Sequence, residues 1–500
     1  MKESLRLRIS LLLLCLAVCG FAAGQAATTL PRSSPEDQGI SSAAILAWVD
    51  TAEREIDALH GFILVRHGRV VAEGHWSPYN ALSPHELFSL SKSFTSTAVG
   101  MAIAEGKLSV DDEVLKFFPQ DAPDSPGENL RAMRIRDLLC MSTGQTEESP
   151  SAPDKISPKA FLAQSVPYKP GTHFKYNTPA TFMLSAIVQK VTGMTVLDYL
   201  GPRLFAPLGI EHPTWQTNTQ GISLGGYGLR VRTEDIARFG QLYLQKGKWQ
   251  GKQLVPASWV EAATARQTSN GSNPKSDWDQ GYGYQFWRCR HGAYRGDGAF
   301  GQFCIVMPEQ DAVMAITSGV RDLQKVLNVF WDTVLPAMQT GQLPPNPEVH
   351  GQLQKRLAGL NLPTQQGFAS SPLAPKVVGK KFAFPANDQK VEEVSIERGR
   401  DGGEMMLVVR MNGSEEHRLA CGSGKWEKGR FPMGQSSNEA VAASGAWQEE
   451  DTYTAKLCFY ETPTCLTIKL RFAGDQLSLA SQSNVGFGPT KQPDLVGHAR

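Results

Sequence analysis

Ser89 and Lys92 are the two side chains of this sequence best suited to carry out a reaction together. A serine hydroxyl is a poor nucleophile at neutral pH unless a base takes its proton, and an uncharged lysine amine can be that base. Residues three apart on a helix share a face and lie about 4.5 Å apart along the axis, at ~1.5 Å per residue. The spacing therefore predicts a nucleophile with its own base, provided that the segment is helical.

The residues that follow Ser89 have the pattern of a helix. Apolar residues recur at helical spacing, and Gly106 stands where such a helix would end. These apolar residues are Leu90, Phe94, Ala98 and Met101. Ser89 would then lie in the first turn, where unpaired backbone N–H groups and the helix dipole favour a developing negative charge. The alternative, Ser89 as a helix N-cap beside a solvated Lys92, would be preferred if this motif stood alone.

Two other serines have similar local patterns in unsuitable surroundings. Ser272 and Lys275 have the same spacing, but they lie in a loop rich in Gly, Asn and Pro that cannot align two side chains. Ser223 lies in a Gly-x-Ser-x-Gly pattern, which provides a nucleophile only between a buried strand and a helix. Polar residues 217–220 precede this pattern and a Gly-Gly pair ends it, so we do not expect Ser223 to react.

Two further motifs follow Ser89 in the chain. Residues 170–178 read Pro-Gly-Thr-His-Phe-Lys-Tyr-Asn-Thr, and residues 296–299 read Gly-Asp-Gly-Ala. Together with Ser-x-x-Lys, they resemble the three motifs of the serine hydrolases related to class C β-lactamases and penicillin-binding proteins. Residues 134–144 and 228–240 are similar to helical segments of that family, and the resemblance covers roughly residues 30–340.

The resemblance implies roles for particular residues. Tyr176 takes the place of the family's tyrosine and would share the proton transfer with Lys92 and deliver a proton to the leaving group. The backbone N–H groups of Ser89 and of Ala299, which follows Gly298 of the third motif, would bind the oxyanion. The reaction would be hydrolysis through an acyl-enzyme, with no metal or organic cofactor.

The sequence departs from the family where the substrate would bind. Thr178 replaces the family's asparagine, with Asn177 one position early, and Gly296 beside Asp297 replaces a lysine that helps to hold a substrate carboxylate in the lactamases. We take Asn177, Thr178 and Asp297 as candidate pocket residues and expect an ester or amide, in a small molecule or peptide, without a carboxylate at that point. A β-lactamase or D-alanyl peptidase is the alternative, with Arg290 and Arg295 as the nearest substitutes for the lysine in sequence.

An inactive sensor or binding protein of the same fold is the alternative from another class. Its binding part would be the C-terminal domain. The presence of Ser89, Lys92 and Tyr176 together argues against it, because a protein without a reaction has no need of all three.

The predicted fold class is α+β. Strand pairs are expected at 62–72 and 305–316, with helices at 41–56 and 323–335. The resemblance implies that residues 28–340 form a β-lactamase/transpeptidase-like domain, in which an antiparallel sheet with terminal helices carries an all-helical insertion. A polar, proline-rich linker is predicted at 341–375, and strand-like runs in 376–500 predict a β-barrel or sandwich without a catalytic motif.

Composition and the N-terminus indicate the compartment and exclude some partners. The 500 residues are 41% hydrophobic and carry a net charge of only +1, so no basic face for nucleic acid is expected. Residues 1–26 have basic residues, an apolar run and then small residues, which is typical of a cleaved signal peptide. Lipoprotein processing at Cys19 is disfavoured by Val18. We therefore expect a periplasmic or secreted protein without a membrane span.

Cysteine pairing becomes plausible in such a compartment. Cys289 and Cys304 flank turn residues between two strand-like runs, and Cys458 and Cys465 do the same, so both pairs are predicted disulfides. The histidines have no zinc-binding spacing, so no metal site is predicted.

Overall fold

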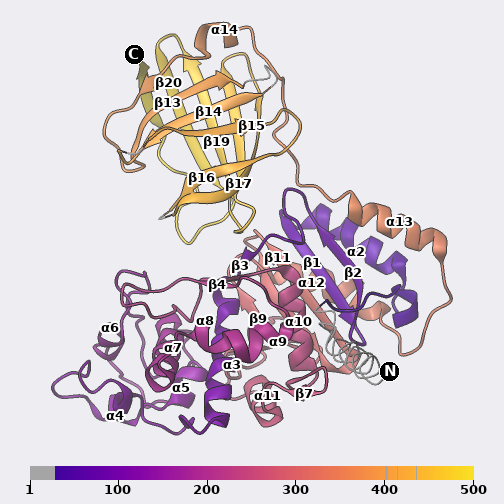
Figure 1. The fold of residues 1–500 in the computed structure, drawn as a ribbon, viewed down its shortest axis with the longest axis vertical. Coiled ribbons are helices and arrows are strands. Elements are labelled where there is room, and N and C mark those ends of the chain that lie inside the picture. The colour runs from indigo at the N-terminus through magenta and orange to yellow at the C-terminus, as the bar shows by residue number, and fades with distance from the viewer. Residues whose placement is uncertain (1–28, 400–403, 414, 435) are drawn as a thin grey trace, which may run out of the picture. The chain divides into compact units, whose positions relative to one another are not determined.

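The computed structural model describes residues 29–399, 404–413, 415–434 and 436–500. The predicted signal peptide, residues 1–26, lies outside them. Two large antiparallel sheets organise residues 31–500, and helices accompany mainly the first (Figure 1).

The helices and strands of the described chain have the following bounds. The helices are α2 (Ser42–Glu55), α3 (Ser91–Ala104), α4 (Glu128–Ala132), α5 (Ile135–Leu139), α6 (Pro158–Leu162), α7 (Thr178–Thr192), α8 (Val196–Leu200), α9 (Ala206–Leu208), α10 (Thr233–Leu244), α11 (Ala257–Thr264), α12 (Leu323–Thr333), α13 (Pro347–Ala358) and α14 (Ala374–Val377). The strands before the C-terminal sheet are β1 (Leu59–Arg66), β2 (Arg69–His75), β3 (His85–Glu86), β4 (Thr214–Trp215), β5 (Leu229–Val231), β6 (Lys248–Trp249), β7 (Lys252–Gln253), β8 (Trp287–Arg288), β9 (Tyr294–Gly298), β10 (Gln302–Met307) and β11 (Ala312–Ser318). The strands of the C-terminal sheet are β12 (Phe382–Ala383), β13 (Val391–Arg398), β14 (Met405–Met411), β15 (His417–Cys421), β16 (Glu427–Met433), β17 (Ser436–Trp447), β18 (Thr452–Cys458), β19 (Cys465–Ala473), β20 (Gln476–Ser483) and β21 (Leu495–Ala499).

The first sheet has the order β2-β1-β11-β10-β9-β8, and all its pairs are antiparallel. The predicted strand pairs and the two terminal helices are confirmed as β1–β2, β10–β11, α2 and α12. Ser41 caps α2, because its side chain accepts a hydrogen bond from the backbone of Ala44. His67 and Gly68 form the turn between β1 and β2, both with positive φ, which suits a two-residue hairpin.

Helices cover both faces of this sheet. Apolar residues of α2 and α12 pack with one face in a single buried cluster, which includes Trp48, Phe62, Ile305 and Phe330. On the other face α10 packs against β10 and β11. Because helices cover both faces of the sheet, strands such as β1 and β11 are buried along their whole length.

The predicted helical insertion lies between β2 and β8. Its central helix α3 packs on α7, and the short turn that precedes α3 packs against β9. Twelve of the fourteen residues of α3 are buried, since other elements surround the helix on every side. Among the described helices none is by itself long and apolar enough to cross a membrane, although the bent pair 178–192 and 196–208 together meets those two criteria.

The second sheet forms a near-closed barrel of residues 382–499. Its order is β15-β14-β13-β12-β21-β20-β19-β18-β17-β16, and a bridge between Gly422 and Ser444 brings its two ends together. Apolar side chains from every part of the sheet form one buried cluster inside it, among them Ile396, Leu407, Trp447, Tyr453 and Leu470. The predicted α+β fold with a C-terminal all-β domain is therefore confirmed.

The segment predicted as a linker contains helix α13. Its Leu353 is buried, together with Leu360 and Leu362, in the cluster that α2 and α12 form with the first sheet. Residues 347–362 therefore pack as part of the first sheet's helical cover.

The prediction of a Cys289–Cys304 disulfide is wrong. In the described chain all six cysteines are free thiols. Cys289 Sγ lies 3.0 Å from a guanidinium nitrogen of Arg295, whereas Cys304 points to the other face of the sheet, towards Gly240 of α10. Side chains on opposite faces of a sheet cannot be bridged.

The second predicted pair is adjacent but reduced. Cys458 and Cys465 are direct partners across β18 and β19, and their sulfur atoms are 2.9 Å apart, which is longer than a disulfide bond of about 2.05 Å. The structure thus contains two facing thiols at this position.

Candidate active site

Ser89 lies at the start of the helix that the sequence predicts. It occupies a 3-10 turn, Phe88–Leu90, which continues directly into α3. Gly106, with positive φ, ends the helix as expected. In the described chain the backbone N–H of Ser89 has no hydrogen-bond acceptor, so it is free to bind a ligand atom.

Lys92 is buried and points at Ser89. Only 1% of the residue is exposed, and its Nζ donates hydrogen bonds to Ser89 Oγ at 3.0 Å, Gly226 O at 2.8 Å and Thr178 Oγ1 at 3.3 Å. Burial lowers the pKa of Lys92 to about 7, while the negative charges of Glu148 and Asp297 oppose part of this shift. A substantial fraction of the amine is therefore uncharged at neutral pH and can accept a proton from Ser89.

Tyr176 lies on the other side of the same pair. Lys92 Nζ is 4.9 Å from the centre of the Tyr176 ring, and this ring stacks on Trp287 at 5.5 Å with 15° between the planes. Burial raises the pKa of Tyr176 above its usual value, and the charge of Asp297 adds to the effect, while a hydrogen bond with Ser89 opposes it. The phenol therefore remains protonated at neutral pH and is a proton donor beside Ser89.

The third motif runs along β9 and the turn after it. A Cβ atom on Gly298 would overlap the carbonyl oxygen of Leu87, so this glycine lets β9 approach the chain just before Ser89. Ala299 begins the turn to β10, and its backbone N–H has no acceptor in the described chain. Two unpaired N–H groups, of Ser89 and Ala299, thus belong to segments that lie close together.

The position of the family's lysine has no room for a side chain. A Cβ atom on Gly296 would lie 2.5 Å from both Leu90 Cδ1 and Ser93 Oγ, well inside van der Waals contact. The glycine is therefore required by the packing of β9 on the segment that contains Ser89.

Asp297 does not present a free negative charge. Arg295 donates two hydrogen bonds to its Oδ2, at 2.8 and 3.0 Å, and the guanidinium stacks at 4.2 Å from the Trp278 ring. Burial raises the pKa of Asp297, and Arg295 opposes this rise. The two side chains form a buried ion pair beside the site, so Asp297 does not offer a substrate an uncompensated charge.

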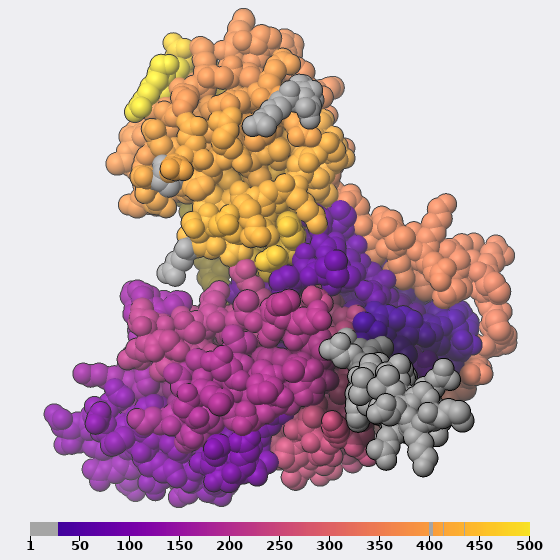
Figure 2. Space-filling model, in the orientation of Figure 1, coloured from indigo at the N-terminus to yellow at the C-terminus, as the bar shows by residue number. Residues whose placement is uncertain are grey.

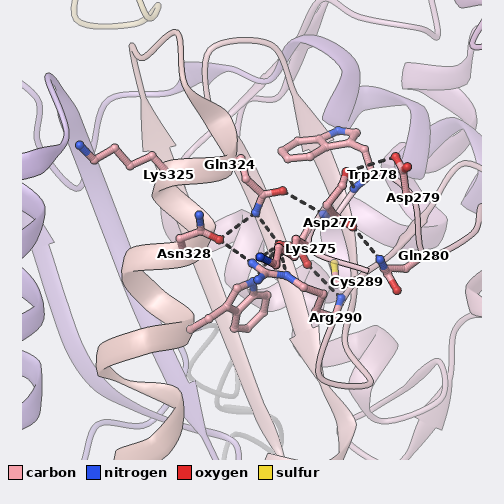
Figure 3. A network of polar contacts seen from close by, with 12 residues as sticks. Lys275, Asp277, Trp278, Asp279, Gln280, Cys289, Arg290, Gln324, Lys325 and Asn328 are labelled. Atoms are coloured by element: carbon pink, nitrogen blue, oxygen red, sulfur yellow. Dashed lines mark hydrogen bonds and ion pairs between the residues drawn. The ribbon is translucent and has the colours of Figure 1, made fainter. Parts of the chain in front are cut away.

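Neither arginine near the third motif can substitute for the missing lysine. Arg295 is fully buried against Asp297, and Arg290 binds Asp277 at 2.7 Å and also contacts Asn328. Figure 3 shows Asp277 at the centre of this network, where it also accepts hydrogen bonds from Gln324 and Trp331. Both guanidinium groups are therefore committed to protein carboxylates.

The two residues after Tyr176 have different roles. Asn177 caps α7, because its Oδ1 accepts a hydrogen bond from Ala180 N and its Nδ2 donates to Gln145. Its side chain is buried in these contacts, so we no longer count it as a pocket residue. Thr178 does lie in the site, because its hydroxyl accepts a hydrogen bond from Lys92 Nζ.

The competing serines remain apart from this arrangement. Ser223 is 1% exposed and its hydroxyl has no hydrogen-bond partner in the described chain. Ser272 lies in an exposed loop. Within the part of the chain that the structure describes, neither hydroxyl has a hydrogen bond to a basic side chain.

Sequence reasoning missed three contributors: Gly226, Trp287 and the Arg295–Asp297 pair. A Cβ atom on Gly226 would lie 2.8 Å from Thr178 Cγ2, so this glycine lets the chain come close enough for its carbonyl to bind Lys92. The Gly-Gly pair at 225–226 was the available signal, since paired glycines mark close approaches as well as turns. Arg295 and Asp297 are two residues apart on one strand, so their side chains share a face, whereas nothing local in the sequence indicates Trp287.

Comparison with known proteins identifies the family. The family model described as Beta-lactamase matches residues 38–325, more than half of the chain. The chain belongs to the beta-lactamase family. Members of this fold family are serine hydrolases that act on amides, esters or peptides.

The individual relatives of this chain are distant in sequence. The chain is 25% identical over 286 residues to the 6-aminohexanoate-dimer hydrolase of Paenarthrobacter ureafaciens, which covers 52% of this chain and 72% of that protein. It is 25% identical to a putative D-alanyl-D-alanine carboxypeptidase of Escherichia coli, over 43% of this chain and 57% of the relative. A solved structure, a putative 6-aminohexanoate-dimer hydrolase from Bacillus anthracis, superposes with a TM-score of 0.51 and 21% identity, over 63% of this chain and 89% of that one, which shows the shared fold.

Proposed function

We propose that this protein is a serine hydrolase in which Ser89 forms an acyl-enzyme with an ester or amide. The observation that carries the proposal is the 3.0 Å contact between Ser89 Oγ and the buried amine of Lys92, whose pKa is lowered to about 7. The presence of a proton donor, Tyr176, on the same pair favours an enzyme over an inactive binding protein of this fold.

The proposed reaction has two stages. Uncharged Lys92 accepts the Ser89 proton as Oγ attacks the carbonyl carbon, and the N–H groups of Ser89 and Ala299 bind the oxyanion. Tyr176 passes a proton to the leaving group, which departs and leaves the acyl group on Ser89. Water then attacks the ester, the deprotonated Tyr176 takes the proton of this water, and protonated Lys92 returns its proton to Ser89 Oγ as the acid is released.

The third motif favours a substrate without a carboxylate at that point. Gly296 leaves no space for a lysine, and Arg290 and Arg295 are bound to protein carboxylates. A charge pair at about 4 Å is worth ~4 kcal/mol at an effective dielectric near 20, so a carboxylate-bearing β-lactam loses much of its binding there. We therefore place neutral esters and amides ahead of β-lactams and D-alanyl peptides.

Pre-steady-state hydrolysis tests this function. p-Nitrophenyl acetate should give a burst of about one p-nitrophenolate per molecule of wild-type enzyme if deacylation is the slower stage, and Ser89→Ala should give none. A panel of acyl esters, a D-alanyl peptide and a chromogenic cephalosporin then ranks the substrates. A cephalosporin with a kcat/KM equal to that of the best ester would overturn the substrate preference while leaving the mechanism intact.

We also propose that the mature protein works outside the cytoplasm, in a periplasm or beyond. The signal-like residues 1–26 support this location. In such an oxidising compartment the facing thiols of Cys458 and Cys465 would form a disulfide. Peptide mapping without reduction, on protein purified from the periplasm or medium, tests both statements.

A further inference from the structure

Three phenylalanine rings meet beside the proposed nucleophile. Phe88 directly precedes Ser89, and Phe300 directly follows Ala299; their ring centres are 5.3 Å apart with the planes nearly perpendicular. The third ring, Phe487, lies 5.0 Å from Phe300 and 5.8 Å from Phe88. Phe487 comes from the loop between β20 and β21 of the C-terminal sheet.

Two of the three residues have an unfavourable backbone. Phe88 has φ +46° and Phe300 has φ +66°, a region that bulky side chains rarely adopt and that is energetically unfavourable for them. Each lies next to a residue whose free N–H is a proposed oxyanion donor. The surrounding fold thus holds two aromatic rings at the site against a local cost, which is typical of residues that serve function.

Phe487 is held in place although it is exposed. The residue is 82% exposed, which is unusual for a phenylalanine. Arg321, after β11, fixes both ends of the loop: it donates to Asn484 O at 3.0 Å and to Thr490 Oγ1 at 2.8 Å. Asn484 in turn donates to Gly319 O at 3.0 Å. These bonds place an uncovered aromatic ring beside the site.

The position of Tyr176 indicates on which side of the reacting carbonyl the leaving group and the acyl group of the substrate lie. The leaving group must lie near this phenol, which gives it a proton, and Tyr176 packs on Trp287 and Tyr282 instead of on the phenylalanines. The three phenylalanines flank the oxyanion donors. The acyl group of the substrate is the part left to contact them.

We infer that Phe487 is a specificity-determining residue, which together with Phe88 and Phe300 binds an apolar acyl group of the substrate. This inference rests on the proposed function, since it assumes that Ser89 is acylated. It adds a substrate class, medium-length or aromatic acyl esters and amides, and gives the C-terminal domain a part in substrate binding. Because each methylene removed from water adds to binding, several methylenes against three rings are enough for a strong preference.

The test compares p-nitrophenyl octanoate with p-nitrophenyl acetate, which share a leaving group. Wild-type enzyme should prefer the octanoate in kcat/KM, and Phe487→Ala should lower the octanoate-to-acetate ratio about tenfold. Phe487→Trp should keep most of the preference. Phe368→Ala is the matched control, because Phe368 is 70% exposed and has no ring contact in the described chain; it should leave the ratio within twofold of wild type.

The outcomes distinguish a failure of this inference from a failure of the proposed function. An unchanged ratio in Phe487→Ala, with wild type active on both esters, overturns the inference alone. A change that follows the size of the leaving group instead of the acyl chain, measured with naphthyl and p-nitrophenyl acetates, also overturns it. If wild type hydrolyses neither ester and a fluorophosphonate does not label Ser89, the proposed function fails, and the inference fails with it.

Discussion

Burial changes what the amine of Lys92 can do at neutral pH. A solvated lysine amine is protonated at pH 7 and cannot accept a proton, but removal of water disfavours the charged form. The lowered pKa of about 7 therefore turns a side chain that is usually a fixed cation into a base for Ser89. In the uncharged form two N–H groups donate to Thr178 Oγ1 and Gly226 O and the lone pair accepts from the Ser89 hydroxyl, so the three contacts still satisfy the buried nitrogen.

The pH dependence of ester hydrolysis should report this group. Because the pKa of Lys92 is lowered, its active uncharged form becomes dominant above about pH 7, so kcat/KM should rise with pH through that region and then level off. Tyr176, whose pKa is raised, stays protonated across the plateau. A rising limb centred near pH 10 would mean that Lys92 is an ordinary solvated lysine.

Removal of a nearby negative charge should move that limb. Glu148 favours the charged form of Lys92, so Glu148→Gln should lower the pKa of Lys92 and shift the limb to lower pH by a fraction of a unit. Glu147→Gln is the matched control, since Glu147 is the adjacent exposed carboxylate and is not among the charges that act on Lys92. Equal shifts in the two variants would contradict the account.

Residue types and spacing predicted the central pair, and the resemblance added Tyr176. Gly226 O could not be predicted, because its contact with Lys92 joins segments far apart in the sequence. Arg295 and Asp297 are two residues apart on β9, where side chains share a face, so a strand assignment at 294–298 would have indicated their pair. Asn177 could have been interpreted correctly, since asparagine before a Thr-Pro helix start is a common N-cap. The resemblance to the family instead suggested a contact between Asn177 and the substrate.

At the scale of elements, the site depends on close approach between a loop and two helices. Gly226 brings its carbonyl to Lys92 on α3 and its Cα against Thr178 at the start of α7. No φ in the left-handed region is involved, so the glycine is required for space and not for conformation.

Gly226→Ala should therefore reduce activity, because the added methyl group displaces the loop whose carbonyl binds Lys92. The new Cβ would lie 2.8 Å from Thr178 Cγ2 and 3.0 Å from its carbonyl oxygen, so the loop must move away from Lys92, at a cost of about 1–3 kcal/mol. We expect kcat to fall at least tenfold with the protein still folded. Gly127→Ala, where nothing lies within 4 Å, should stay within twofold of wild type. Circular dichroism and ester kinetics on both variants measure this, and full activity of Gly226→Ala would contradict the contact.

Strands and helices were predictable where their pattern was strong. The β10–β11 hairpin and α2 follow clear periodicities, and most strands of the C-terminal sheet do so as well. Strands β15, β16 and β21 have weak patterns, because short strands with Gly, Pro or charged residues lack the alternation. The proposed Cys289–Cys304 pairing failed because flanking a turn does not place two side chains on the same face.

At the scale of the whole described chain, the C-terminal domain contacts the segment between β2 and β8 at several points (Figure 2). Tyr79 donates to Thr462 O at 2.9 Å, and Glu86 N donates to Glu461 O at 2.9 Å. Arg230 forms two hydrogen bonds with Glu439, at 3.0 and 3.1 Å. Since Glu86 lies three residues before Ser89, these contacts connect the barrel to the segment that contains the nucleophile.

Arg230→Ala should destabilise the protein, because it leaves three carboxylates without their cation. Arg230 lies 3.9 Å from Glu86 and 3.8 Å from Glu461, besides Glu439, and all four side chains are largely buried. Loss of one partner of a buried pair costs about 3 kcal/mol. Burial already raises the pKa of Glu86, so without Arg230 the loss should be larger at pH 8 than at pH 5, where the carboxylates take up protons.

Denaturant unfolding at the two pH values measures this effect. Arg471→Ala is the control, because Arg471 forms an exposed pair with Asp451 and its loss should be much smaller. A loss for Arg230→Ala that equals the control at both pH values would show that the cluster contributes little to stability.

The central claim, that Ser89 is the acylated residue, is tested most directly by mass spectrometry of the protein after reaction with a fluorophosphonate. Wild type and Ser223→Ala should each gain one adduct, located in the peptide that contains Ser89, and Ser89→Ala should gain none. Lys92→Ala should react at least a hundredfold more slowly, because the hydroxyl has lost its base. An adduct that persists in Ser89→Ala, or that maps to Ser223 in wild type, would contradict the account.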